Sequence, residues 1–127
     1  MSRKPLILIV EDDPGSLMLA TAALEADGFD VAGSESAELA REAIAGRMPA
    51  LILMDIGLPG MDGLDFTREL KARPRTAAIP IVALTAHNMP LYERAAMAAG
   101  CEGFIAKPVS PAALTAEVRT FLNLGPR

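Results

Sequence analysis

The segment Leu6-Ile7-Leu8-Ile9-Val10-Glu11-Asp12-Asp13 decides the fold of this chain, because an unbroken apolar run ends abruptly in three acidic residues. A continuous apolar run of this length predicts a strand that is buried on both faces, as in the centre of a parallel sheet. A second such run, Ala50-Leu51-Ile52-Leu53-Met54, ends at Asp55. Two buried strands that each end in acid predict a sheet that carries carboxylates along one edge.

Strands and helices are predicted to alternate along the whole chain. The apolar patterns place strands at residues 6–10, 29–33, 50–54, 79–84 and 103–106, and helices at residues 16–26, 35–45, 64–72, 90–99 and 111–122. Gly100 is a plausible helix C-cap, and Ser110 with Pro111 forms a helix start. Because strands joined through helices pair in parallel by right-handed crossovers, the fold class is α/β, a doubly wound five-stranded parallel sheet flanked by five helices. Ligands of such sheets bind outside the carboxyl ends of the strands.

Length, composition and charge restrict the possible classes of protein. The chain has 127 residues, a net charge of −4 and 51% hydrophobic residues, which predicts one domain over residues 1–127. The acidic balance argues against charge-driven binding of nucleic acid or of a membrane surface. A single cysteine excludes a disulfide framework and a cysteine-based zinc site. No apolar run approaches a membrane span or a signal peptide, so we expect a cytoplasmic protein.

Polar residues stand where the predicted strands end. Glu11 and Asp12 follow the first strand, Asp55 the third, Thr85 the fourth and Lys107 the fifth. Carboxylates that converge on one edge repel one another unless a cation joins them, and oxygen-only ligands suit Mg²⁺ or Mn²⁺. A divalent cation and Lys107 together balance the three negative charges. Thr85 adds a neutral hydroxyl that can donate to a phosphoryl oxygen.

Four segments, in this order and spacing, resemble a response-regulator receiver domain of the CheY-like type. They are ILIVEDD at residues 7–13, MDIGLPGMDG at 54–63, ALTA at 83–86 and GFIAKP at 103–108. The resemblance covers nearly the whole chain. It implies a flavodoxin-like sheet with the strand order 2-1-3-4-5.

The resemblance also implies a role for each residue of the acidic edge. Asp55 would be the phosphoacceptor, which takes a phosphoryl group from a phosphohistidine of a histidine kinase or a histidine phosphotransfer protein. Asp12 would ligate Mg²⁺ directly, Glu11 directly or through water, Asp55 would supply a third oxygen, and the backbone carbonyl of Gly57 a fourth. Mn²⁺ can substitute for Mg²⁺. Lys107 would pair with the phosphoryl group, and its bond to Pro108 would be cis.

The family's switch would comprise Thr85 and Phe104. Output contacts would come from the face formed by the fourth helix, the fifth strand and the fifth helix, within residues 89–122. Phe104 stands where members often carry Tyr, so its outward position lacks a hydroxyl anchor. Gly57 replaces a side chain that often shields the phosphoryl group, which predicts a shorter-lived phosphoform.

The first predicted helix resembles the face on which phosphodonor helices dock. The residues concerned are Ser16, Leu17, Met18 and Thr21, and for Leu17 and Met18 a core role fits the helical apolar stripe equally well.

Ordinary structural roles are favoured for several other residues. Asp13 is interpreted as a solvated loop residue, and Asp62-Gly63 as turn chemistry. His87 is interpreted as a partly exposed loop histidine, although its position near the pocket rim also fits a group that tunes access to the site. Cys101 is expected to pack in the interior.

Several functions remain open at this point. The pattern also resembles stand-alone regulators of the DivK type, which act only through protein contacts, and the Met1 start and short tail favour this interpretation. The alternative is a receiver domain excised from a hybrid histidine kinase or a larger response regulator. A phosphatase of the haloacid dehalogenase type is disfavoured, because Gly57 stands where a second aspartate is needed. A degenerate receiver is disfavoured because the acids, Thr85 and Lys107 are all present. On all favoured readings the chain is a phosphoacceptor signalling domain rather than an enzyme.

Overall fold

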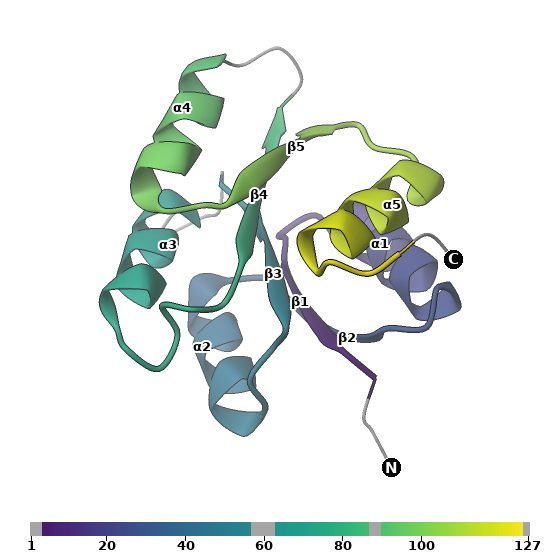
Figure 1. The fold of residues 1–127 in the computed structure, drawn as a ribbon, viewed down its shortest axis with the longest axis horizontal. Helices are drawn as coiled ribbons and strands as arrows, with labels where there is room; N and C mark the ends of the chain where they lie inside the picture. The colour runs from purple at the N-terminus through teal and green to yellow at the C-terminus, as the bar shows by residue number, and fades with distance from the viewer. Residues whose placement is uncertain (1–3, 57–62, 87–89, 126–127) are drawn as a thin grey trace.

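The computed structural model describes residues 4–56, 63–86 and 90–125 (Figure 1). Within these residues, strands and helices alternate as predicted. The strands are β1 (Leu6–Val10), β2 (Asp30–Ser34), β3 (Leu51–Asp55), β4 (Ile81–Ala86) and β5 (Gly103–Lys107). The helices are α1 (Pro14–Ala26), α2 (Ala37–Gly46), α3 (Gly63–Ala72), α4 (Pro90–Ala99) and α5 (Pro111–Phe121).

The described strands form one parallel sheet in the order β2-β1-β3-β4-β5, which confirms the predicted topology. Helices α1 and α5 cover one face of the sheet, and α2, α3 and α4 cover the other (Figure 1). The β1–β3 register pairs Val10 with Met54, and the β3–β4 register pairs Asp55 with Leu84. The residues that follow these pairs therefore reach the same carboxyl edge.

Capping interactions and proline explain where the element boundaries differ from the prediction. Helix α1 begins at Pro14 rather than at residue 16, because the Asp13 carboxylate accepts a hydrogen bond from Ser16 N–H at 2.9 Å. Helix α2 begins after Ser36, whose hydroxyl accepts from Leu39 N–H at 3.2 Å. Strand β4 begins after Pro80, which has no N–H for the ladder.

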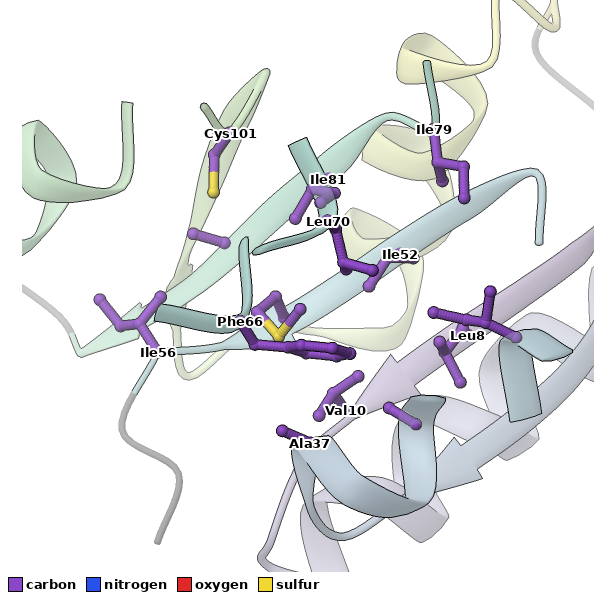
Figure 2. Packing of buried hydrophobic residues seen from close by; sticks show 14 of the residues in the cluster. Leu8, Val10, Ala37, Ile52, Ile56, Phe66, Leu70, Ile79, Ile81 and Cys101 are labelled. Atoms are coloured by element: carbon purple, nitrogen blue, oxygen red, sulfur yellow. The ribbon is translucent and has the colours of Figure 1, made fainter. Parts of the chain in front are cut away.

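One face of the sheet packs around an aromatic ring. Leu8, Val10 and Ile52 project from the strands into a cluster with Phe66 and Leu70 of α3 (Figure 2). Cys101 is buried in the same cluster, so its predicted packing role is confirmed.

The opposite face is built from aliphatic residues of the same strands. Ile7, Ile9 and Leu53 pack with Leu24 of α1 and Leu114 of α5. Successive residues of β1 thus enter opposite clusters, which confirms that this strand is buried on both faces.

The amino edge of the sheet is closed by charged side chains. Lys71 Nζ donates to the carbonyls of Ala77 at 3.0 Å and Ile79 at 2.7 Å, and to Glu102 Oε1 at 2.6 Å. The other carboxylate oxygen of Glu102 accepts from Ile81 N–H at 2.6 Å. These bonds tie α3 and the β4 entrance to the turn before β5.

No helix in the described part of the chain is both long enough and apolar enough to cross a membrane.

Candidate functional site

Three carboxyl groups gather at the carboxyl edge of the sheet. Glu11 and Asp12 follow β1, and Asp55 ends β3. Each offers an oxygen that lies within 4.8 Å of the others. Glu11 is only 2% exposed, whereas Asp12 is exposed and Asp55 is intermediate. The parallel topology therefore brings together the three acids that the sequence singled out.

Lys107, the last residue of β5, extends into this acidic group. Its ammonium forms an ion pair with the Glu11 carboxylate, and Nζ lies 3.8 Å from Asp55 Oδ2. The peptide bond from Lys107 to Pro108 is cis, as predicted. Lys107 thus places one positive charge beside two of the three acids.

The environment of Glu11 resists its ionisation. Burial of the carboxyl group raises its pKa from the ordinary 4.5 to about 7, and a hydrogen bond with Asp55 acts in the same direction. The hydrogen bond from Lys107 offsets part of this rise. Without a cation, Glu11 therefore takes up a proton more readily than an ordinary glutamate does.

Thr85 is buried, and the part of the chain that the structure describes offers its hydroxyl no hydrogen-bond partner. It lies in β4, one residue beyond the partner of Asp55 in the sheet register, and is 1% exposed. Among the described residues, Thr85 Oγ1 is the buried side-chain polar atom that lacks a partner. An unpaired buried hydroxyl costs about 1–3 kcal/mol, and an acceptor brought by a ligand would offset that cost.

The donor set fits a hard divalent cation. The three clustered groups are carboxylates, and Mg²⁺ binds through one or two carboxylates together with waters and phosphate oxygens. Lys107 adds a positive charge beside Asp55, and Thr85 follows Leu84, the β4 residue that pairs with Asp55. The residues present therefore fit a magnesium site.

Gly63 positions Asp55 by direct packing, a contact that could not be predicted from the sequence. A Cβ atom at Gly63 would lie 2.2 Å from the backbone oxygen of Asp55 and 2.6 Å from Ile56 Cα. The first residue of α3 is thus packed directly against the end of β3. Thr67 reinforces this start, because its hydroxyl donates to the Gly63 carbonyl at 2.7 Å. The only sequence signal was the glycine itself, which was interpreted as part of a turn.

Asp13 does not join the acidic group. It is exposed, and its carboxylate accepts hydrogen bonds from Ser16 N–H at 2.9 Å and Ser16 Oγ at 2.7 Å. These bonds hold the pKa of Asp13 below its usual range. The interpretation of Asp13 as a solvated residue was therefore incomplete, because the residue caps α1.

Two predicted site residues, Gly57 and His87, lie outside the described residues, as do Asp62 and Met89. Phe104, the predicted switch ring, lies in β5 and is 40% exposed.

The outer surfaces of α1 and α4 carry exposed apolar side chains. Leu17 belongs to the core, since it packs against the cluster on that face and its Cδ1 lies 3.0 Å from the Cβ position of Gly33. Met18 is 70% exposed. On α4, Leu91 and Tyr92 are exposed. The sequence left a core role and a surface role open for both residues. The structure places Leu17 against the core and Met18 on the surface.

Comparison with known proteins agrees with this geometry. Residues 7–119 match the family model described as the response regulator receiver domain. The polar-differentiation response regulator DivK of Brucella ovis is 36% identical over 121 residues, which cover 92% of this chain and 95% of that protein. A crystal structure of a putative response regulator from Chloroflexus aurantiacus J-10-fl has a TM-score of 0.91 at 30% identity, and covers 95% of this chain and 99% of the other.

Other relatives are much longer than this chain. The sensor protein GacS of Pseudomonas syringae pv. syringae is 35% identical over 129 residues, which cover 99% of this chain but 14% of that protein. The chain spans 52% of the phosphate regulon transcriptional regulatory protein PhoB of Rhizobium meliloti, at 34% identity.

Proposed function

The chain belongs to the response regulator receiver domain family, and we propose that it acts as a stand-alone switch that accepts a phosphoryl group on Asp55. The observation that carries this proposal is the position of Lys107, whose ammonium reaches both the buried Glu11 and the end of β3 at Asp55. The stand-alone role is supported by the similarity to DivK over 95% of its length.

The proposed reaction is the transfer of a phosphoryl group from a phosphohistidine to Asp55. A carboxylate oxygen of Asp55 forms the new bond to phosphorus while the bond from phosphorus to the donor nitrogen breaks. The electron pair of the broken bond stays on the imidazole, which leaves as neutral histidine because its other nitrogen carries a proton. Phosphoryl transfer of this kind depends mainly on positioning and electrostatics.

Each residue of the edge has one task in this reaction. Glu11, Asp12, Asp55 and the Gly57 carbonyl would hold Mg²⁺, with Mn²⁺ as a substitute, and the cation would neutralise charge on the phosphoryl oxygens. Lys107 exchanges its contact with Asp55 for one with the phosphoryl group. Gly63 holds the backbone of Asp55 in place.

The switch couples the phosphoryl group to the surface of α4, β5 and α5. Thr85 gains the acceptor that its buried hydroxyl lacks, and its movement opens space for the ring of Phe104, which is 40% exposed in the present state. A downstream protein that binds the two states differently reads the change. Coupling energies of about 1–3 kcal/mol correspond to affinity changes of roughly 5–150-fold.

The proposed donor is a histidine kinase or a histidine phosphotransfer protein that docks beside the acidic edge. The exposed Met18 of α1 offers an apolar contact for a donor helix near Asp12 and Asp55. The half-buried Leu17 packs beneath the helix against the core.

The test is the intact mass of the protein after incubation with a small phosphodonor, with and without Mg²⁺. We expect a Mg²⁺-dependent gain of one phosphoryl group, which is lost in Asp55→Asn. The matched control is Asp13→Asn, which keeps an N-cap residue on α1 and retains the gain. A gain of mass in Asp55→Asn, or its loss in Asp13→Asn, would contradict the assignment of Asp55.

The second candidate is a receiver that forms part of a hybrid histidine kinase, and the similarity to GacS over 99% of this chain favours it. The phosphorylation chemistry would be the same, but the donor would be attached to the same polypeptide. The length of the native open reading frame distinguishes the two candidates.

A further inference from the structure

A cavity of about 330 Å³ lies between the carboxyl-terminal ends of α2 and α3, on the face of the sheet that carries the Phe66 cluster (Figure 1). Its apolar lining consists of Ile44, Ala45, Met48, Leu70 and Pro74. Ile44 and Leu70 are buried, whereas the other three are exposed. The cavity therefore has an apolar interior that opens to solvent.

One charged pair in the lining is already satisfied within the chain. Arg41 donates to both carboxylate oxygens of Glu69, at 2.6 and 2.7 Å, and its guanidinium lies 5.2 Å from the centre of the Phe66 ring. The hydrogen bonds from Arg41 hold the pKa of Glu69 below its usual range. Glu69 is therefore ionised at neutral pH, and Arg41 balances its charge.

Two further arginines give the lining a surplus of positive charge, although the chain as a whole carries a net charge of −4. Arg73 Nη2 lies 4.0 Å from Glu69 Oε2, which is the limit of an ion pair. Arg75 is exposed and forms no ion pair or hydrogen bond with any residue that the structure describes. Both guanidinium groups are thus open to an external anion.

The turn after α3 satisfies its own carbonyl groups, so these arginines are not needed as caps of the helix. The Thr76 hydroxyl donates to the Leu70 carbonyl at 2.5 Å. The Arg73 carbonyl accepts from Thr76 N–H at 3.1 Å and from Ala77 N–H at 2.8 Å. Basic side chains near a helix end often bind such carbonyls, and here the turn itself fills that role.

We propose that this cavity binds a small organic monocarboxylate with an aliphatic body. Its volume lies at the lower end of the range of about 300–1,000 Å³ that is typical of small-molecule sites. The aliphatic body packs on Ile44 and Leu70, and the carboxylate faces Arg73 and Arg75, because a guanidinium fork matches two carboxylate oxygens. A phosphate dianion fits less well, since Glu69 opposes each added negative charge.

The interior of the cavity favours a small molecule over an acidic segment of a partner protein. The lining residues that are open to either occupant are the exposed ones, Ala45, Met48, Arg73, Pro74 and Arg75. Ile44 and Leu70 are 8% and 3% exposed, so only a slender group that enters the cavity contacts them. None of the residues that line the cavity belongs to the acidic site, so binding here does not depend on phosphorylation of Asp55.

The proposal is tested with octanoate as the probe, in methyl NMR spectra of the whole chain. We expect saturable shifts of the Ile44, Met48 and Leu70 methyl groups, and much weaker binding of acetate and of octanol, which lack the body and the charge respectively. Arg75→Gln should weaken octanoate binding by at least about fivefold. Arg68→Gln is the matched control: it removes the same charge from an exposed position of α3 outside the cavity and should bind octanoate as the wild type does.

Four outcomes would overturn the proposal. They are an absence of saturable shifts in the wild type, equal weakening by Arg75→Gln and Arg68→Gln, acetate binding as tight as that of octanoate, and tighter binding of a triglutamate peptide, which would assign the site to an acidic protein segment. Thermal unfolding shows that a loss of binding is local. Because Arg75 is exposed and lacks a partner among the described residues, Arg75→Gln should keep the Tm of the wild type.

Discussion

The two ends of the sheet handle charge in opposite ways. At the amino edge, Lys71 donates hydrogen bonds to two carbonyls and to Glu102, and Glu102 also accepts a hydrogen bond from the N–H of Ile81. At the carboxyl edge, three carboxyl groups lie within 4.8 Å of one another, and Lys107 pairs with two of them. The first arrangement satisfies its members within the chain, whereas in the described residues the second sets Lys107 against three carboxyl groups and leaves the Thr85 hydroxyl without a partner.

This difference separates stability from function within one fold. Groups at the amino edge are expected to stabilise the protein and to have no influence on the cation. Groups at the carboxyl edge are expected to cost stability and to regain it when a cation or a phosphoryl group binds.

The largest expected effect comes from Gly63, which packs against the carboxyl edge. Gly63→Ala should lower the free energy of unfolding by about 2–3 kcal/mol, because the new methyl group would meet the Asp55 backbone oxygen at 2.2 Å. Mg²⁺ affinity should fall with it, because Asp55 is displaced. Gly46→Ala at the end of α2 is the control: its Cβ meets nothing within 4 Å, and alanine favours the helix by up to about 1 kcal/mol. Urea unfolding measures both, and similar losses in the two variants would contradict this account.

Removal of the amino-edge lysine should have the next largest effect. Lys71→Met leaves Glu102 and two carbonyls without their donor, so the free energy of unfolding should fall by about 1–3 kcal/mol. The Mg²⁺ dissociation constant should not change. Arg68→Met on the same helix is the control, because the exposed Arg68–Asp65 pair contributes at most about 0.5 kcal/mol. A change in Mg²⁺ affinity in Lys71→Met would show that the two ends are not independent.

The stability of the protein and its affinity for Mg²⁺ should both depend on pH in the range between the ordinary pKa of Glu11 and its raised value. The folded protein holds the Glu11 proton more tightly than the unfolded chain does, so this group's contribution to stability is complete below pH 4.5 and is lost as the pH rises through about 7. Mg²⁺ must displace that proton. Its affinity should therefore rise by up to about tenfold per pH unit below pH 7 and level off above it.

Isothermal titration with Mg²⁺ from pH 5.5 to 8 measures this dependence. Glu11→Gln removes the titrating group, so the remaining, weaker Mg²⁺ affinity should be flat across the same range. A slope that persists in Glu11→Gln would assign the pH dependence to another group.

The smallest expected changes in the free energy of unfolding come from substitutions of two buried threonines, Thr85 and Thr67. Thr85→Val should raise the free energy of unfolding by up to about 1 kcal/mol, because it removes a buried hydroxyl without a partner. Thr67→Val should lower it by about 1 kcal/mol, since the Thr67 hydroxyl donates to Gly63 at 2.7 Å. Thermal unfolding of both variants provides the measurement. A change of the same sign in both would show that the Thr85 hydroxyl has a partner in solution.

Much of the architecture could be predicted from local patterns. The apolar runs at residues 6–10 and 50–54 were sufficient for central strands, because a strand buried on both faces has no polar positions. Boundaries were less predictable where a side chain competes for a backbone N–H. Helices α1 and α2 begin at other residues than predicted, because Asp13 and Ser36 cap them. Strand β4 begins later than predicted, after Pro80.

The candidate site was predictable to the extent that it follows from topology. Residues after parallel strands share one edge, so Glu11, Asp12 and Asp55 had to meet if the strand order held. The packing of Gly63 against Asp55 was not predictable, because a clash with a backbone carbonyl depends on how α3 approaches β3.

The sequence by itself determined the alternation of elements, the acids at one edge and the exclusion of a disulfide framework, since these depend on residue type and spacing. Only the tertiary structure decided the raised pKa of Glu11, the unpaired hydroxyl of Thr85 and the cavity between α1 and α5 that Ala23 and Leu114 line. The physical reason is the same for all three. Burial, hydrogen-bond satisfaction and empty volume are properties of what surrounds a side chain, and those surroundings come from segments far apart in the sequence.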